Sequence, residues 1–107
     1  MSIGKNLVRT TMPSSLEVLH TVPIAKKNEI RSITACNKDE TSDATWYLYI
    51  RTGGSLVALI PGTVQWKIPM GRNIDYETWK VLSAGDTIEG YAAGSVDIHI
   101  DGAEVDV

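Results

Sequence analysis

The sequence predicts an all-β fold, an antiparallel β-sandwich or jelly roll of about eight short strands with a loose N-terminal arm. Apolar residues recur at every second position rather than with the helical period of about 3.6 residues. β-Branched and aromatic residues gather in runs that are bounded by Gly, Asn, Asp, Ser and Pro. These turn signals recur at intervals near ten residues, which is typical of sandwiches and barrels.

The first strands are expected at 15–23 and 29–36. The segment SLEVLHTVP places Leu16, Val18 and His20 on one face and ends at a proline, which cannot donate a hydrogen bond to a sheet. Residues 29–36 do not keep one strict alternation. A bulge, or burial on both faces, is therefore expected in this second strand.

The segment at 44–52, ATWYLYIRT, has the strongest strand pattern and places Trp46 and its alternate neighbours on one face. Gly53-Gly54 predicts a tight turn into a partner strand at 55–60. The segments at 44–52 and 55–60 are therefore expected to form a hairpin. The next segment, TVQWKI at 63–68, alternates until a proline ends it.

The last third of the chain combines one ambiguous segment with one clear pattern. Residues 75–82 fit a strand or a single helical turn, and the neighbouring strands favour β. Residues 81–105 predict a hairpin, followed by a bend at Gly102 and a final edge segment, AEVDV. The buried face of this hairpin is expected to hold Ile88, Val96, Ile98 and Ile100.

Length and charge limit the class of protein. The 107 residues fit one β-sandwich domain at 15–107 behind an arm at 1–14. The formal net charge is −3 without a basic stripe, so we expect no nucleic-acid partner. No apolar run is long enough for a signal peptide or a membrane span, so a soluble chain with no membrane partner is expected. The single Cys36 cannot form an intramolecular disulfide.

Chemically active residues are few. His20 and His99 occupy alternating strand positions with no nucleophile motif nearby, so no catalytic site and no cofactor are predicted. The acidic run around His99 could hold a metal ion, but acidic residues also protect an exposed strand edge, and the latter interpretation is favoured. The residues of this run are Asp97, His99, Asp101, Glu104 and Asp106.

Apolar and aromatic residues give the candidate contacts. The sequence contains no Phe, so Trp and Tyr supply all the aromatic mass. Tryptophans could stack sugar rings, although a place in the core or in a subunit interface is favoured. The arm carries apolar residues that could dock on a partner. The candidate interface residues are Leu7, Val8, Met12, Leu16, Trp46, Trp66 and Trp79.

Two segments resemble a group of small phage virion proteins with β-sandwich folds. In that group a Val-Pro turn leads into an Ile-x-x-Ile strand that closes on Cys-Asn, and a late Leu-x-Ala-Gly-Asp turn precedes a last hairpin that ends in Gly-x-Glu. The likeness covers about three quarters of the chain and departs from the pattern at 25–28 and 61–80. The matching residues are Val22, Pro23, Ile30, Ile33, Cys36 and Asn37, and then Leu82, Ala84, Gly85, Asp86, Gly102 and Glu104.

The resemblance implies a non-enzymatic virion component made in the host cytoplasm. A capsid decoration (cement) protein bound to the major capsid protein is the favoured role, and a tail or fibre-associated protein is the alternative. Members of such groups commonly form symmetric oligomers, and a trimer is favoured here. A carbohydrate-binding module and a small enzyme are the competing classes. The first predicts coplanar exposed tryptophans, and the second predicts a histidine beside a nucleophile.

Overall fold

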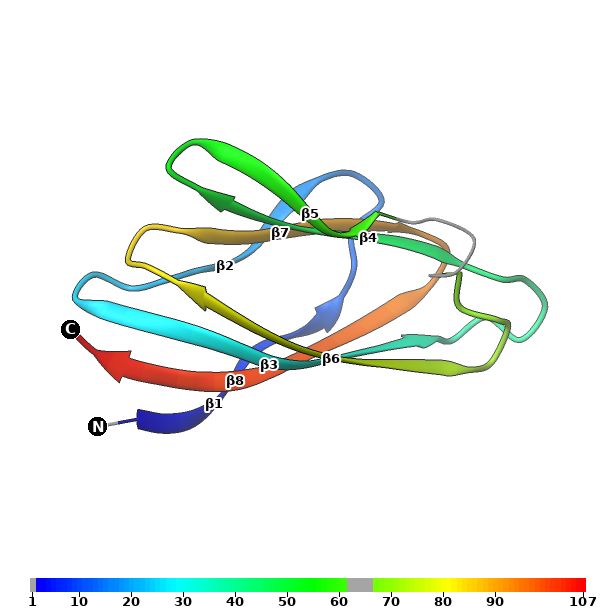
Figure 1. Cartoon of the computed structure of the whole chain (residues 1–107). Coiled ribbons are helices and arrows are strands. Elements are labelled where there is room, and N and C mark those ends of the chain that lie inside the picture. Colours follow the sequence, from blue (N-terminus) through cyan, green and yellow to red (C-terminus); the bar gives the residue numbers. More distant parts are fainter. Residues whose placement is uncertain (1, 62–66) are drawn as a thin grey trace.

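The computed structural model describes residues 2–61 and 67–107, which form eight strands in two four-stranded sheets (Figure 1). All strand pairs are antiparallel, so the predicted β-sandwich is confirmed. Sheet A has the order β1-β8-β3-β6 and sheet B the order β2-β7-β4-β5. The strands are β1 Ser2–Thr11, β2 Glu17–Thr21, β3 Lys26–Asn37, β4 Thr45–Thr52, β5 Ser55–Pro61, β6 Asn73–Leu82, β7 Thr87–Ala93 and β8 Val96–Asp106.

Strand pairing follows a nested order. β1 pairs with β8, β2 with β7, β3 with β6 and β4 with β5, as in a long hairpin that has been rolled into two layers. This is the connectivity expected of a jelly roll. Among the eight described strands, only β4 and β5 follow each other in the chain and lie in the same sheet, and they form the predicted hairpin. Its turn residues Gly53 and Gly54 have φ of 56° and 82°, as a type I′ turn requires.

The predicted loose arm is wrong, because residues 2–11 form β1 and pair with β8 along most of its length. The register shifts between Asn6 and Val8, and this bulge allows the adjacent residues Leu7 and Val8 both to be buried. The bulge also breaks the alternation that marks a strand in the sequence. β1 is therefore part of the sandwich rather than an arm outside it.

Bulges decide the faces of β2 and β3. The bulge expected in the second predicted strand lies between Ile30 and Ser32 of β3. A second register shift, between Val18 and His20, was not expected in β2. Because of it, Val18 is exposed while His20 is partly buried, so the predicted shared face of Leu16, Val18 and His20 is wrong.

The segment at 75–82 is confirmed as a strand, because it lies within β6 and pairs with β3. Most of the predicted strand at 63–68 lies outside the described residues. Its last residue, Ile68, is fully buried and forms a bridge with Ala44. The region before β6 is therefore attached to the loop that follows β3.

The predicted hairpin at 81–105 is wrong in its pairing but correct in its buried face. β7 pairs with β2 and β4 in sheet B, whereas β8 pairs with β1 and β3 in sheet A. The turn at Gly94, with φ of 115°, therefore carries the chain from one sheet to the other. The four residues expected on the buried face, Ile88, Val96, Ile98 and Ile100, are all buried.

The predicted bend at Gly102 and the predicted edge segment after it are also corrected. β8 continues through Gly102 to Asp106 and lies between β1 and β3 at the centre of sheet A. Gly102 is fixed by space, because an ideal Cβ placed on it would lie 1.7 Å from the carbonyl oxygen of Glu29. The acidic residues near the end of β8 therefore do not protect an open edge.

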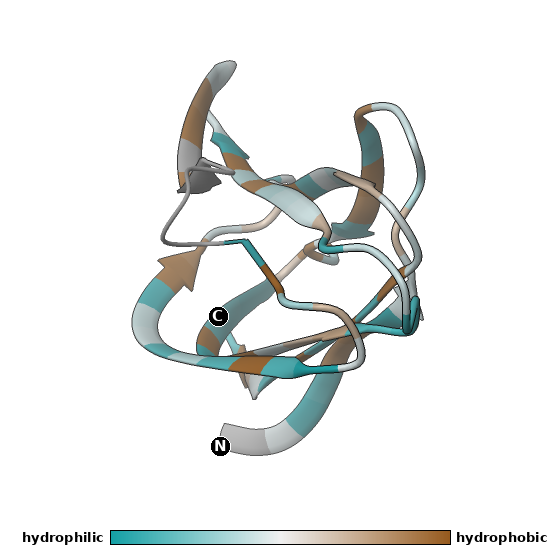
Figure 2. Ribbon diagram, turned by 90° about the vertical axis from the view of Figure 1, so that its right-hand side faces the viewer, coloured by the Kyte–Doolittle hydropathy of each residue, from teal (hydrophilic) through white to brown (hydrophobic). Residues whose placement is uncertain are grey.

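The core lies between the two sheets. Figure 2 shows hydrophobic and hydrophilic bands alternating along the ribbons, as expected when each strand has one buried and one outer face. Trp46 and Leu48 of β4 pack in one cluster with aliphatic side chains from sheet A. The largest fully buried side chains are Trp46, Ile30, Ile33, Leu48, Ile68, Leu82, Ile88, Ile98, Ile100, Val22 and Val96.

Candidate interaction surfaces

Six of the seven predicted interface residues are described by the structure, and they fall into two groups. Trp79 and Leu16 are exposed, at 64% and 40% of their surface, and can contact a partner. The placement of four others is corrected, because their side chains fill the core between the sheets. Trp66 lies outside the described residues. The four core residues are Leu7, Val8, Met12 and Trp46.

An apolar strip, defined here as Trp79 and Val81, lies on the outer side of the edge strand β6. Val81 exposes 50% of its surface. The guanidinium of Arg31, from the neighbouring strand β3, lies 5.4 Å from the centre of the Trp79 ring and also pairs with Glu29 at 3.1 Å. An exposed tryptophan beside an arginine is typical of protein–protein contact surfaces.

A tyrosine row, defined as Tyr47, Tyr49 and Tyr91, lies on the outer face of sheet B. Tyr47 and Tyr91 face each other across β4 and β7, with ring centres 4.5 Å apart and planes 11° apart. Tyr49 stacks on Tyr91 at 6.5 Å. Burial, and then the adjacent Tyr91, raise the pKa of Tyr49 above its usual value. The stacked rings cover one another, so this row is a poor platform for sugar rings but a suitable protein contact.

An ion pair lies next to the tyrosine row. Arg51 Nε donates to Glu89 Oε2 at 2.7 Å, and the Thr87 hydroxyl donates to the same oxygen at 2.8 Å. The Glu89 side chain is buried, while that of Arg51 is 43% exposed. The hydrogen bond from Arg51 is the main reason why the pKa of Glu89 lies below its ordinary value.

This lowered pKa predicts a dependence of stability on pH. Because the folded pKa of Glu89 lies below the unfolded value, its contribution is complete above the unfolded pKa of 4.5 and is lost as pH falls through the folded value. We expect Glu89→Gln to lower the free energy of unfolding by roughly 1 kcal/mol at neutral pH, the scale of a half-exposed pair. Urea unfolding near neutral pH and at about pH 3 should show this difference shrinking in acid.

Glu40→Gln is the matched control for this measurement, because Glu40 lies in an exposed loop and has no ion pair with any described residue. We expect this variant to follow the wild type at both pH values. A loss in Glu89→Gln that is equally large in acid would show that the pair does not depend on the charge of Glu89.

A groove runs between the edge strands β1 and β2 and has a volume of about 300 Å³. It is lined by residues 7–11 of β1, by Pro13 and by residues 17–19 at the edge of β2. Val18, at its rim, exposes 55% of its surface. This β1–β2 groove joins the outermost strands of the two sheets and is a candidate contact surface.

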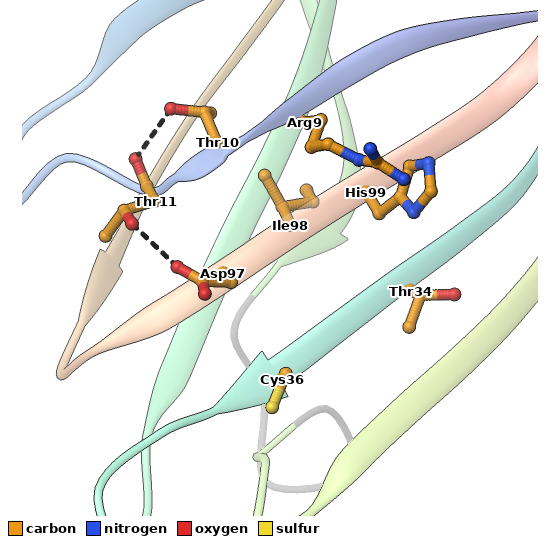
Figure 3. A pocket seen from close by; sticks show the side chains of 8 residues that line it. All are labelled: Arg9, Thr10, Thr11, Thr34, Cys36, Asp97, Ile98 and His99. Atoms are coloured by element: carbon orange, nitrogen blue, oxygen red, sulfur yellow. Dashed lines mark hydrogen bonds between the residues drawn. The ribbon is translucent and has the colours of Figure 1, made fainter.

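A second hollow of about 270 Å³ lies on the outer face of sheet A (Figure 3). Arg9 and His99 are register partners at one end of it, and Cys36 lies toward the other end. His99 Nε2 lies 2.8 Å from Asn6 Oδ1 and 3.1 Å from Asp101 Oδ1. Within residues 2–61 and 67–107, no hydrogen bond joins a histidine to Cys36 or to a serine. The hollow therefore lacks the nucleophile–base pair of a covalent catalyst.

The carboxylates near His99 are bound by other residues of the chain. Asp97 accepts a hydrogen bond from Thr11 at 2.6 Å, which lowers its pKa, and Lys38 lies 3.1 Å away. Asp106 pairs with Lys26. In the part of the chain that the structure describes, no three His, Cys, Asp or Glu side chains come together as a metal-binding group. The same part contains no helix that could span a membrane.

The other histidine belongs to a polar network that crosses between the sheets. His20 Nε2 lies 2.7 Å from Asn28 Oδ1, and Asn28 Nδ2 donates to Glu104 at 3.2 Å. Glu104 also accepts from Lys5 at 3.1 Å, and these donors, Asn28 first, lower its pKa. Asn28 is fully buried. The network therefore joins β2 of sheet B to three strands of sheet A and has a structural role.

The sequence interpretation missed the tyrosine row and the β1–β2 groove. The alternation at 44–52 did place Tyr47 and Tyr49 on the face opposite Trp46. The contact with Tyr91 depends on the pairing of β4 with β7, which are separated by most of the second half of the chain. The groove depends on β1, whose bulge hides its strand pattern.

Comparison with known proteins identifies the fold but no family. No protein-family model and no curated protein sequence matches this chain. The core of Drosophila NLP is similar, with a TM-score of 0.51 and 11% identity over 98% of each chain. The nucleoplasmin-like N-terminal domain of Drosophila FKBP39 has a TM-score of 0.49 and 21% identity, over 100% of this chain and 90% of that one.

A pentameric capsid protein isolated from metagenomic phage sequences is a further match, with a TM-score of 0.40 and 14% identity over 95% of this chain and 61% of that one. At these identities the likeness to the NLP core concerns the fold alone. This chain is a small β-sandwich whose fold is similar to that of the NLP core, and what it contacts must be inferred from its own surface.

Proposed function

We propose that this chain is a non-enzymatic structural protein of a phage virion, namely a capsid decoration (cement) protein that binds the major capsid protein as a homo-oligomer. The observation that carries the proposal is the outer surface of the sandwich. It has an exposed Trp79–Val81 strip on an edge strand and a stacked tyrosine row on the opposite sheet. Such side chains concentrate the binding energy of protein–protein contacts.

The histidines support a non-enzymatic role. The described partners of the ring nitrogens are side-chain oxygens of this chain. His20 faces the amide oxygen of Asn28, and His99 faces the amide oxygen of Asn6 and the carboxylate of Asp101. A base for catalysis would instead face a nucleophile or a bound substrate. The tryptophans support protein contact over sugar binding, because Trp46 is buried and Arg31 lies over the ring of Trp79.

Assembly of identical subunits is supported by the fold. The crystal structure of the NLP core is described as providing insight into pentamer formation and histone binding. From that protein we take only the assembly of identical copies into this proposal. Many copies on a regular lattice add avidity, so that each single contact can be weak. A tail or fibre-associated role would use the same surfaces and is the alternative.

Two measurements test this function. Light scattering of the full chain should give a closed oligomer, and three or five times the chain mass of 11.7 kDa separates the favoured trimer from a pentamer. The labelled protein should then sediment with capsids of the phage that encodes it, at a fixed ratio to the major capsid protein. A monomer at all concentrations that also fails to sediment with capsids or with tails would refute the proposal.

A further inference from the structure

The two lateral sides of the sandwich are different surfaces. β1 and β2 line one groove, so they form one side together. The opposite ends of the two sheets are β6 and β5, which form the other side. A contact between unlike surfaces of identical copies is head-to-tail, and it closes into a ring when its rotation is right.

The edges of sheet A carry opposite charges. β1 contains Lys5 and Arg9 and no acidic residue, whereas the first half of β6 contains Asp75 and Glu77. Both Arg9 and Glu77 are exposed, and neither side chain forms a hydrogen bond or ion pair with another residue that the structure describes. These two unpaired charges are therefore available to a neighbouring molecule.

Strand register aligns these charges across the sheet. Arg9 is the partner of His99, His99 of Thr34 and Thr34 of Asp75, so one row joins the basic edge to the acidic edge. Glu77 lies two residues along from Asp75 on the same face. If β6 of a second copy lies beside β1, its Asp75 and Glu77 are therefore at the same height along the strands as Arg9.

The edges of sheet B are apolar at both sides. β5 exposes Leu56 and Val57, at 39% and 52% of their surface. On the opposite side, the start of β2 exposes Val18, and Leu16 directly precedes it. One lateral contact would therefore match apolar residues at the level of sheet B while it matches opposite charges at the level of sheet A.

We propose that the β5–β6 side of one copy packs against the β1–β2 groove of the next copy, with Arg9 opposite the acidic half of β6. Strand direction fits this arrangement, because successive strands of sheet A are antiparallel and β1 and β6 therefore run in opposite directions. The proposal rests on the homo-oligomer of the proposed function and adds the surfaces that form it. The tyrosine row remains free for the lattice.

A charge exchange tests this contact in the full chain. We expect Arg9→Glu and Glu77→Arg each to raise the concentration at the midpoint of assembly at least about tenfold, because like charges then meet at the contact. The double variant carries one changed residue at each side of every contact, so its assembly should return to near the wild-type midpoint. Light scattering over a concentration series provides the measurement, and Glu40→Arg is the control for net charge.

The outcomes separate this contact from the proposed function. An oligomeric wild type whose assembly is unchanged in both single variants would refute the contact and leave the function standing. Two weakened single variants without recovery in the double variant would refute the pairing of Arg9 with the β6 acids. A monomeric wild type would instead count against the oligomer on which both rest.

Discussion

Substitution of Gly102 by Ala is expected to destabilise the fold by about 3 kcal/mol or more, a large part of the 5–15 kcal/mol that is typical of a small domain. A Cβ at this position would lie 1.7 Å from the carbonyl oxygen of Glu29 and 3.2 Å from Leu7 Cδ1. The first atom is backbone and cannot move aside as a side chain can. The two central strands of sheet A, β8 and β3, would have to separate.

Gly4→Ala is the control for this prediction, because its added Cβ meets no atom within 4 Å in β1, which pairs with the same strand β8. We expect its free energy of unfolding to stay within about 0.5 kcal/mol of the wild type. Urea unfolding followed by circular dichroism measures both variants. If Gly102→Ala unfolded at the same urea concentration as Gly4→Ala, the close approach of β3 and β8 at this point would be refuted.

The alternating pattern of the sequence predicts the layers of this protein better than its connections. The segment at 44–52 alternates without interruption, and its three predicted inner residues are all buried. Alternation reports only which face of a strand is buried, and it contains no information about which strand lies beside it. For this reason the buried face of 81–105 was predicted correctly, while β7 and β8 were assigned to one hairpin although they belong to different sheets.

The candidate surfaces, too, are predictable where they depend on the face of a strand and not where they depend on strand pairing. The exposed side of Trp79 can be anticipated once β6 is known to be a strand, although its sequence also fits a helical turn. The sequence predicts Leu7 and Val8 as docking residues because they are apolar and lie in the predicted arm. The bulge in β1 makes both of them core residues. Bulges are set by contacts with neighbouring strands, so local sequence rarely reveals them.

Replacing Trp46 by alanine is expected to destabilise the fold far more than replacing Trp79, because Trp46 is a core residue and Trp79 is a surface residue. Trp46→Ala removes a fully buried ring from the centre of sheet B and leaves a cavity, so the free energy of unfolding should fall by about 3–5 kcal/mol. Trp79→Ala removes a ring that is 64% exposed and touches Arg31. Its loss should cost the isolated chain less than about 1 kcal/mol.

The same pair of variants should respond in the opposite order in binding. Because Trp79 lies on an exposed strip beside an arginine, Trp79→Ala should weaken assembly or capsid binding at least tenfold, the scale of an aromatic hot spot of about 2 kcal/mol. Trp46→Ala that remains folded at low temperature should bind with nearly wild-type affinity, because its ring does not reach the surface. Unfolding in urea and sedimentation with capsids measure the two effects separately. A Trp79→Ala variant that loses stability without losing binding would place this ring among the structural residues and remove the main support for a contact surface on β6.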